Sequence, residues 1–436
     1  MSLQKNAVIG LMLFALFLGA GNIIFPPLLG QMAGENLFPA MAGFLITGVG
    51  LPLLAVISIA NAGGGLQTIA SRVHPLFGII FTLILYITIG PFFGIPRTAT
   101  VSYEIAVIPF LTENLLDAKW ILAVFTLFFF IITIVLALNP AKLVDRIGKI
   151  LTPILFSVIA ALALKSIFTP MGTIGPAIGD YETQPFFRSF IEGYLTMDVL
   201  AALVFAIVII NILRDEGITK KGPVLKAMTI AGLIAAVGLS IVYISLGYIG
   251  ATSLDVIGLQ SNGGAVLALA SKVLYGSSGT AILAVTIIFA CLTTSIGLVS
   301  ACAQYFNEVF PKHSYKTYVF IIAGFSALIS NVGLAKLITI SLPVLMMIYP
   351  LAIVLMLLSF IDKLFDRKPI VYSLALLATA VVSIFDSLSN ADIHFATVDS
   401  LFSYLPFYEQ RIGWIVPAIV GGIIGFVLTF FTKKRN

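Results

Sequence analysis

The chain has 436 residues, of which 60% are hydrophobic and only 10% are charged. Soluble domains carry roughly 25% charged residues, so this composition excludes an ordinary soluble fold and predicts an all-α polytopic membrane protein. The net charge of +5 does not indicate nucleic-acid binding, because the cationic residues lie between apolar runs.

Apolar runs follow one another along the whole chain. About twelve spans of about 20 residues account for its length, with counts of about eleven or thirteen left open by two short runs. No low-complexity linker divides the sequence, so we expect one membrane domain over residues 1–436. The predicted runs are Ala7–Gln31, Pro39–Ala60, Leu76–Ile108, Ile121–Leu138, Ile147–Leu164, Phe187–Leu213, Val224–Ile249, Thr280–Tyr305, Tyr318–Leu334, Ala335–Phe360, Ile370–Ile384 and Trp414–Phe431.

The first run is interrupted by Leu18–Pro27, which reads Leu-Gly-Ala-Gly-Asn-Ile-Ile-Phe-Pro-Pro. Backbone groups freed inside a bilayer must find partners, so such a break is tolerated only where it lines a cavity or binds something. A half-helix that begins at a break suits a carboxylate, and one that ends there suits Na⁺ or an ammonium group. Together they fit a zwitterion, and the break predicts a transporter of an amino acid with a cation. Asn22 is either part of that site or a residue that bonds helix to helix.

The third run carries two charged residues, Arg97 and Glu104. They share a helical face and lie about 10 Å apart along it. A charged residue inside a span either pairs within the bundle or meets a water-filled pathway. We interpret Arg97 and Glu104 as a gate or a structural ion pair rather than as direct substrate contacts.

The sixth run has a second interruption, Ile191–Leu200, with Gly193 and two carboxylates, Glu192 and Asp198. Interrupted spans at corresponding positions in two halves are typical of a transporter site. A carboxylate in the middle of a span is functional by default. No residue-level repeat is evident, so the correspondence with the first run rests on position alone.

Two features of the later chain belong to the same prediction. The outer segment Gly250–Gly279 contains an amphipathic helix, Gly264–Tyr275, which is either an external lid or an ordinary loop helix. The eighth run contains Thr293, Thr294 and Ser295. Membrane hydroxyls usually bond to their own backbone, so this cluster becomes a candidate ion site only because the first span is broken.

The distribution of charge predicts the topology. With the N-terminus in the cytoplasm and spans alternating, most of the 24 Lys and Arg residues fall on the inner side. We therefore expect both termini in the cytoplasm.

Three long motifs in order, Phe14–Pro27, Gly90–Glu104 and Glu192–Ala202, resemble the branched-chain amino acid:cation symporter family, LIVCS or BrnQ. The resemblance implies uptake of leucine, isoleucine and valine across a bacterial inner membrane, driven by a Na⁺ or H⁺ gradient. It also implies the LeuT fold of the APC superfamily, with two inverted five-helix repeats and two extra helices. These would be residues 1–165 for helices 1–5, residues 187–360 for helices 6–10, and residues 370–431 for helices 11 and 12.

The same resemblance implies the site residues. The substrate would lie against the unwound first and sixth helices, at Gly19, Ala20, Gly21, Asn22, Tyr194, Leu195, Thr196 and Asp198. Asp198 stands where the fold usually has a Ser, so it would hold the substrate ammonium, a cation or the coupling proton. Sodium would be held at a first site by Asn22 and Thr196, and at a second by Ala15, Leu18, Thr293, Thr294 and Ser295. Apart from the coupling cation, no cofactor is implied.

Other function classes fit less well. The chain is not expected to be an enzyme, because His74, His313 and His394 are scattered and no catalytic motif is present. The chain lacks the repeated ring of charges that is expected of a channel. It also lacks the phosphate-binding loop that is expected of a primary pump. The remaining alternative is a cation-coupled transporter of other small neutral amino acids.

Overall fold

The structure is a computed structural model that describes residues 3–116, 118–138, 140–215 and 217–432, with side chains for 5–116, 118–138, 153–215 and 217–431. Every regular element in these ranges is a helix. The α-helices are α1 (Leu3–Phe17), α2 (Ala20–Ala33), α3 (Leu37–Leu45), α4 (Leu51–Ala62), α5 (Leu66–Ala70), α6 (Pro75–Ile87), α7 (Gly94–Ala106), α8 (Lys119–Ala137), α9 (Pro140–Phe168), α10 (Asp180–Thr183), α11 (Pro185–Glu192), α12 (Asp198–Asp215), α13 (Lys221–Ala251), α14 (Leu254–Ile257), α15 (Gly263–Val309), α16 (Tyr315–Ser330), α17 (Leu334–Ile361), α18 (Pro369–Asn390), α19 (Ala396–Phe402) and α20 (Ile415–Thr432). Short 3₁₀ or π turns are η1 (Gly34–Asn36), η2 (Ile46–Gly50), η3 (Thr88–Phe92), η4 (Ile108–Phe110), η5 (Glu113–Leu115), η6 (Gly193–Thr196) and η7 (Asp362–Phe365).

The helices confirm the all-helical membrane architecture. Among the described residues, seven helices or merged helices are long and apolar enough to cross a membrane, and one bent pair makes up to eight. Four shorter apolar helices fall on the predicted first, fifth, ninth and twelfth runs: Lys5–Phe17, Pro153–Phe168, Tyr315–Ser330 and Ile415–Phe431. The count of twelve spans stays a prediction.

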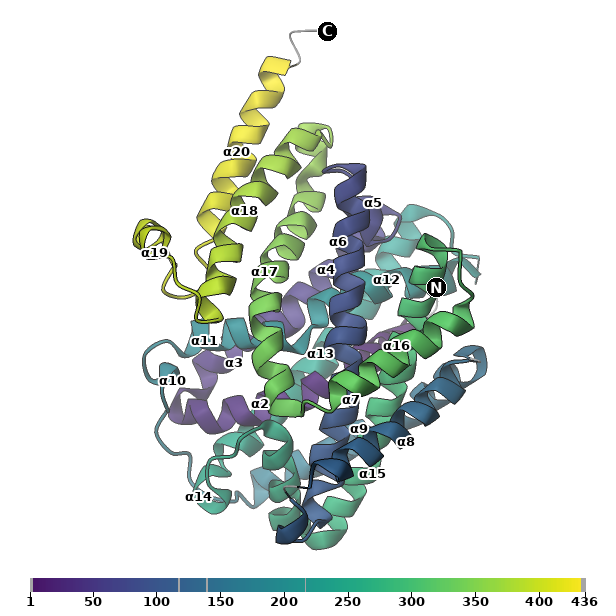
Figure 1. Cartoon of the computed structure of the whole chain (residues 1–436), viewed down its shortest axis with the longest axis vertical. Coiled ribbons are helices and arrows are strands. Elements are labelled where there is room, and N and C mark those ends of the chain that lie inside the picture. Colours follow the sequence, from purple (N-terminus) through teal and green to yellow (C-terminus); the bar gives the residue numbers. More distant parts are fainter. Residues whose placement is uncertain (1–2, 117, 139, 216, 433–436) are drawn as a thin grey trace.

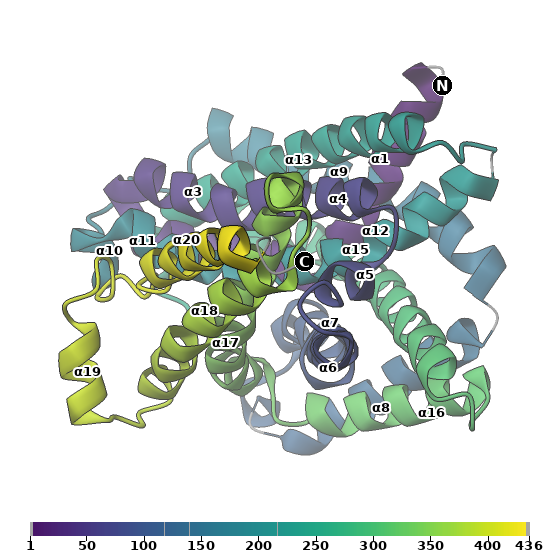
Figure 2. The ribbon, with the colours of Figure 1, turned by 90° about the horizontal axis from the view of Figure 1, so that it is seen from above.

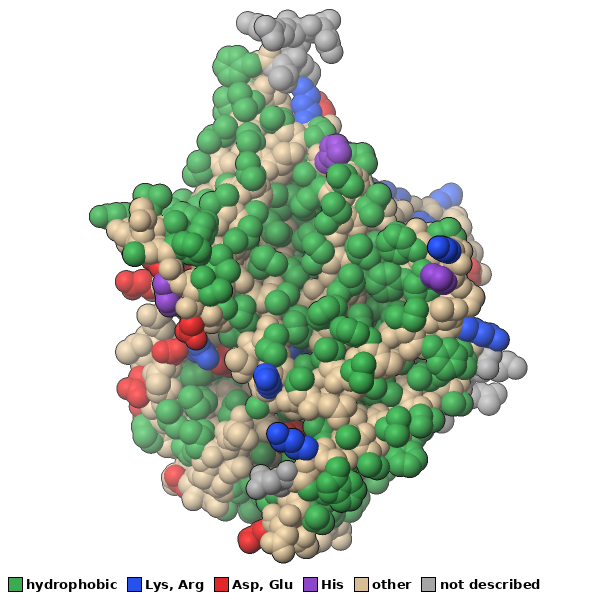
Figure 3. Space-filling model, in the orientation of Figure 1, with side chains coloured by type: hydrophobic (Ala, Val, Ile, Leu, Met, Phe, Trp, Pro, Cys, Tyr) green, Lys and Arg blue, Asp and Glu red, His purple; other side chains and the backbone are tan. Residues whose placement is uncertain are grey.

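The surface of the bundle suits a lipid environment. Hydrophobic side chains cover most of the face shown in Figure 3, and most of the charged side chains lie towards its edges. On α8 alone, Trp120, Leu127, Phe128 and Ile131 are exposed. Large apolar side chains exposed along a whole helix indicate contact with acyl chains rather than with water.

The last two long helices form a pair beside the rest of the bundle. Figures 1 and 2 show α18 and α20 side by side, with α19 projecting from the loop between them. A Cβ on Gly421 would overlap the carbonyl oxygen of Leu374, and one on Gly425 would press on the backbone of Val371. Small residues let α20 approach α18 closely.

Helix α2 is held in the centre of the molecule by α13. A Cβ on Gly250 would overlap the carbonyl oxygen of Pro27, and a Cβ on Gly30 would overlap that of Gly247. The two backbones therefore touch over about a turn of each helix. This contact fixes the half-helix that follows the first break.

Helix α15 contains the predicted amphipathic helix Gly264–Tyr275 as its first part. A kink at Gly276, where φ is +65°, separates that part from the long remainder. The Asn262 side chain caps its start by accepting the N–H of Ala265 at 3.0 Å. A Cβ on Gly263 would overlap the carbonyl oxygen of Ile24, so this segment begins against α2. Its role as a lid stays a prediction.

Candidate functional site

The first break is shorter than the sequence predicts. Helix α1 ends at Phe17 and α2 begins at Ala20, while Pro26 and Pro27 lie inside α2. The N–H of Gly19 donates to the Phe17 carbonyl at 2.7 Å and to Asn22 Oδ1 at 3.0 Å. Asn22, the third residue of α2, thus satisfies the N–H of the N-cap residue Gly19, as the third residue of a capping box does.

The same bonds change the end of α1. In a continuous helix the N–H of Gly19 would bond to the carbonyl of Ala15, four residues earlier. Here it donates to Phe17 and Asn22 instead. The last carbonyls of α1 therefore lose the partners that a continuing helix would supply.

The second break lies between α11 and α12, whose axes differ in direction by 41°. Met197 adopts a left-handed conformation, with φ of +62°. The Thr196 hydroxyl donates to the Gly193 carbonyl at 2.8 Å and accepts the N–H of Asp198 at 3.3 Å. Asp198 consequently stands at the first position of α12, where a negative charge is favoured by the helix dipole.

The two breaks meet through their side chains. Asn22 Nδ2 donates to Asp198 Oδ2 at 2.7 Å, and the Tyr243 hydroxyl of α13 donates to the same oxygen at 2.6 Å. Asn22 Nδ2 also contacts the Tyr243 hydroxyl. All three side chains are buried. The sequence interpretation missed Tyr243, and an isolated tyrosine in an apolar run offered no signal that would have found it.

The second oxygen of Asp198 has bonding capacity left. Asn22 and Tyr243 both donate to Oδ2, the Thr196 hydroxyl lies close to the carboxylate, and Asp198 lines a cavity between the two breaks. A carboxylate inside the bundle is costly unless both oxygens are satisfied. This oxygen is therefore the natural place for a cationic group.

The cavity is lined by both polar and apolar groups. The polar and backbone groups come from the two breaks and include Gly19, Ala20, Gly21, Asn22, Thr196 and Asp198. The apolar groups are Leu16, Phe17, Ile89, Met197, Ala201, Phe205 and Leu298. In this conformation the cavity is about 40 Å³, which holds only a few water molecules, so it must widen before it can take a small molecule with a charged end and a hydrocarbon end.

Two predicted substrate residues do not line this cavity. Tyr194 stacks on Tyr349 of α17, with ring centroids 4.4 Å apart. Leu195 presents its carbonyl to the guanidinium of Arg97. Both residues belong to the second break, but their contacts are with α7 and α17.

The three hydroxyls of α15 do not converge. Thr294 lines the cavity and lies next to Gly19, where a Cβ would be 3.3 Å from the Thr294 methyl group. Ser295 is turned towards α8 and accepts a hydrogen bond from Thr133 at 3.3 Å, while Thr293 bonds to its own helix. Successive residues point about 100° apart around a helix, so one break can meet only one of them. Thr294 is therefore the hydroxyl that meets the first break, and its grouping with the carbonyls of Ala15 and Leu18 as a sodium site stays a prediction.

Arg97 and Glu104 do not form an ion pair with each other, and their alternative role as a gate stays a prediction. Arg97 is 1% exposed and donates from Nη1 to the Leu195 carbonyl and from Nη2 to Ser341 Oγ at 3.2 Å. Glu104 accepts from Asn262 Nδ2 at 3.3 Å. Their separation along α7 is too great for direct contact, so each bonds with a different neighbour. Arg97 lines the cavity with Asp198.

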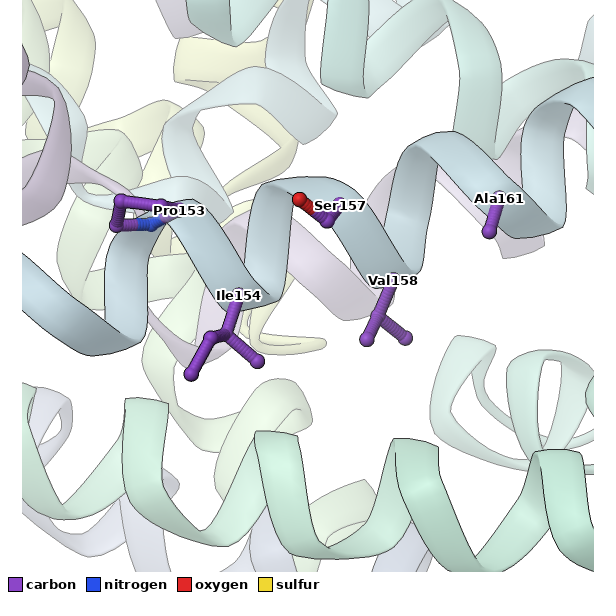
Figure 4. A pocket seen from close by; sticks show the side chains of 5 residues that line it. All are labelled: Pro153, Ile154, Ser157, Val158 and Ala161. Carbon is purple, nitrogen blue, oxygen red and sulfur yellow. The ribbon is translucent and has the colours of Figure 1, made fainter.

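A second hollow lies along α9 and is not related to this site. Pro153, Ile154, Ser157, Val158 and Ala161 line it, all from the one helix (Figure 4). None of these side chains is charged. The hollow therefore lacks the convergent polar groups of a binding site.

The sequence is similar to that of known transport proteins along its whole length. A family profile described as "Branched-chain amino acid transport protein" matches residues 2–432. The branched-chain amino acid permease BraB of Bacillus subtilis is 50% identical, covering 99% of this chain and 98% of that protein. The branched-chain amino acid transport system 2 carrier protein of Pseudomonas aeruginosa is 44% identical, covering 96% of this chain and 94% of that protein.

Two solved structures share the fold. Mhp1, a nucleobase-cation-symport-1 family transporter with bromovinylhydantoin bound, has a TM-score of 0.63 at 16% identity, covering 98% of this chain and 92% of that chain. MhsT in complex with L-phenylalanine has a TM-score of 0.53 at 15% identity, covering 97% and 98%. The chain therefore has the LeuT-type transporter fold and belongs to the family of branched-chain amino acid transport proteins, which are membrane transporters and not enzymes.

Proposed function

We propose that this protein is a secondary symporter that imports leucine, isoleucine and valine across a bacterial inner membrane by alternating access. The relatives at 50% and 44% identity are named for branched-chain amino acids. The observation that carries the proposal is the cavity between two broken helices, which is lined by the Asp198 carboxylate together with aliphatic and aromatic side chains.

The proposed mode of binding follows from the polar and apolar groups that line the cavity. The substrate ammonium bonds to Asp198 Oδ1, and the branched side chain packs against Phe17, Phe205 and Leu298. An apolar pocket distinguishes one methylene by only about 1–3 kcal/mol. Leucine, isoleucine and valine should therefore compete with one another for uptake.

The coupling cation is either Na⁺ or H⁺. For sodium, the candidate ligands are the carbonyls at the end of α1 and the hydroxyl of Thr294, which lies beside Gly19. Asn22 Oδ1 keeps one lone pair after accepting the Gly19 N–H. For a proton, Asp198 is the carrier, because it is the titratable group at the junction of the breaks.

The central experiment is leucine uptake into proteoliposomes under an imposed Na⁺ gradient and, separately, an imposed pH gradient. Asp198→Asn should abolish concentrative uptake under whichever gradient drives the wild type. Asp215→Asn, at the exposed end of the same helix, is the matched control and should transport normally. Near-normal accumulation by Asp198→Asn would overturn the proposal.

Transport of other small neutral amino acids is the alternative. It is separated by competition, with excess alanine, serine or threonine added to labelled leucine uptake. Inhibition by isoleucine and valine but not by these smaller residues supports the proposal. Leucine uptake that ignores excess isoleucine and valine contradicts it.

A further inference from the structure

Arg97 is a buried cation with no anionic partner in the protein. It lies in the middle of the bundle on α7, is 1% exposed, and its guanidinium stands 5.3 Å from the centre of the Phe25 ring. Its hydrogen-bond partners are a carbonyl and a hydroxyl, from Leu195 and Ser341. None of the ion pairs among the described residues includes it. A charged side chain inside a membrane bundle normally has a counter-charge or a functional pathway beside it.

The guanidinium also has donors to spare. Arginine carries five N–H groups, and only Nη1 and Nη2 make hydrogen bonds here. Its Nε is buried without an acceptor. Bidentate recognition of a carboxylate requires two adjacent donors of this planar group.

The position of Arg97 relates it to the cavity. A Cβ on Gly21 would lie 3.5 Å from Arg97 Nη1, so the guanidinium is adjacent to the first turn of α2. The N-terminal end of that helix favours an anion as well. Asp198 lines the same cavity but bonds to Asn22 and Tyr243 instead of Arg97. The cavity thus contains one fixed positive and one fixed negative charge, each with bonding capacity left.

We propose that Arg97 binds the carboxylate of the transported amino acid, while Asp198 binds its ammonium group. This inference rests on the proposed function and assigns to Arg97 a role in substrate selection in place of the gate predicted from sequence. A free α-carboxylate becomes a requirement for tight binding. Neutral amides and amines with the same branched side chain should be rejected by the wild type.

The test compares leucine with leucinamide, which keeps the amine and the side chain but lacks the negative charge. Purified full-length protein is titrated with each compound at a pH where both amines are protonated, and binding is followed by the rise in melting temperature. The wild type should bind leucine at least ~10-fold more tightly than leucinamide, because charge-assisted hydrogen bonds are the stronger ones. In Arg97→Gln, affinity for leucine should fall at least ~10-fold and that for leucinamide by less than about threefold.

Two further variants separate substrate binding from structural support of η6. Ser341→Ala removes one partner of the guanidinium while keeping its charge, so the preference for leucine over leucinamide should persist. Arg97→Lys keeps the charge but loses the planar fork. It should retain the preference with weaker binding, and it decides the matter if Arg97→Gln does not fold.

The outcomes distinguish this inference from the proposed function. Equal losses for leucine and leucinamide in Arg97→Gln, or loss of the preference in Arg97→Lys, would overturn the role of Arg97 alone. A wild type that binds none of leucine, isoleucine and valine would overturn the proposed function itself. Collapse of the leucine preference in Arg97→Gln, with its retention in Ser341→Ala, supports the inference.

Discussion

At the scale of single residues, Asn22 connects the local structure of a break to its chemistry. Its Oδ1 accepts the Gly19 N–H at the start of α2, and its Nδ2 binds Asp198 176 residues further along the chain. One side chain therefore both starts a half-helix and fixes the carboxylate of the other break. The sequence identified Asn22 and Asp198 as polar residues inside spans. It gave no information about Tyr243, because a long-range partner is defined by packing and not by a local pattern.

Tyr243 should be needed for tight substrate binding. Its hydroxyl donates to Asp198 Oδ2 at 2.6 Å, so Tyr243→Phe removes one of the hydrogen bonds that position and stabilise the carboxylate. A hydrogen bond to a charged group contributes about 1.5–3 kcal/mol, and we expect the KM for leucine uptake to rise ~10-fold or more. Tyr248→Phe on the same helix is the control. An unchanged KM in Tyr243→Phe would contradict the assignment of Asp198 to the site.

Thr294 and Ser295 should respond differently although they are neighbours. Thr294 lies beside the break at Gly19, whereas Ser295 bonds to Thr133 of α8. If sodium drives uptake, Thr294→Ala should raise the sodium concentration for half-maximal uptake several-fold. Ser295→Ala should leave that value unchanged and lower stability by about 1 kcal/mol, the contribution of a typical hydrogen bond. A sodium response that shifts in Ser295→Ala but not in Thr294→Ala would contradict this placement.

At the scale of elements, the half-helices are held by close packing as much as by their own bonds. Helix α2 carries the first break, and its prolines and glycines fit against α13 with no space for a Cβ at Gly250 or Gly30. In a membrane, small residues at such a crossing replace the hydrophobic driving force that acts in water. The packing of α2 against α13 therefore fixes the position of the first break.

Replacing one of these glycines should separate the two helices. In Gly250→Ala the new methyl group meets the carbonyl of Pro27, and overpacking of this kind costs about 1–3 kcal/mol. We expect a lower melting temperature and weaker leucine binding in detergent. Gly324→Ala in α16 is the control, because a Cβ there meets nothing within 4 Å and alanine is the better helix former. Equal melting temperatures for the two variants would show that the α2–α13 contact does not position the site.

The sequence predicted which elements are broken better than it predicted how they face one another. Two glycines, a lone polar Asn22 and two prolines in an apolar run predicted the first break, and the structure confines it to Leu18 and Gly19. Pro26 and Pro27 stay helical because neighbouring helices can satisfy the carbonyls that a proline leaves free. The rotation of α15 about its axis, which turns Ser295 towards α8, depends on the helices packed around it. It therefore could not be predicted from the residues next to Ser295 in the sequence.

At the scale of the whole molecule, composition alone was enough to predict an all-helical membrane protein. Apolar runs locate the helices, because each must bury its backbone bonds internally. The number of spans is harder to predict, since α15 joins a short first helix to a span across a kink at Gly276 and four of the apolar helices are short. The meeting of the two breaks follows only from the fold, which brings Asn22 and Asp198 within 2.7 Å between Nδ2 and Oδ2.

The orientation in the membrane can be tested with two single cysteines on either side of α15. Ser261 precedes this helix and Lys312 follows it, and both are exposed. With most Lys and Arg residues on the inner side, Ser261 should be outside and Lys312 inside. The native Cys291 and Cys302 are 0% and 1% exposed, so they add little background labelling.

A membrane-impermeant maleimide applied to intact cells should label Ser261→Cys at once and Lys312→Cys only after permeabilisation. The opposite pattern would contradict the predicted orientation and place both termini outside. Labelling of both cysteines in intact cells would mean that α15 does not cross the membrane.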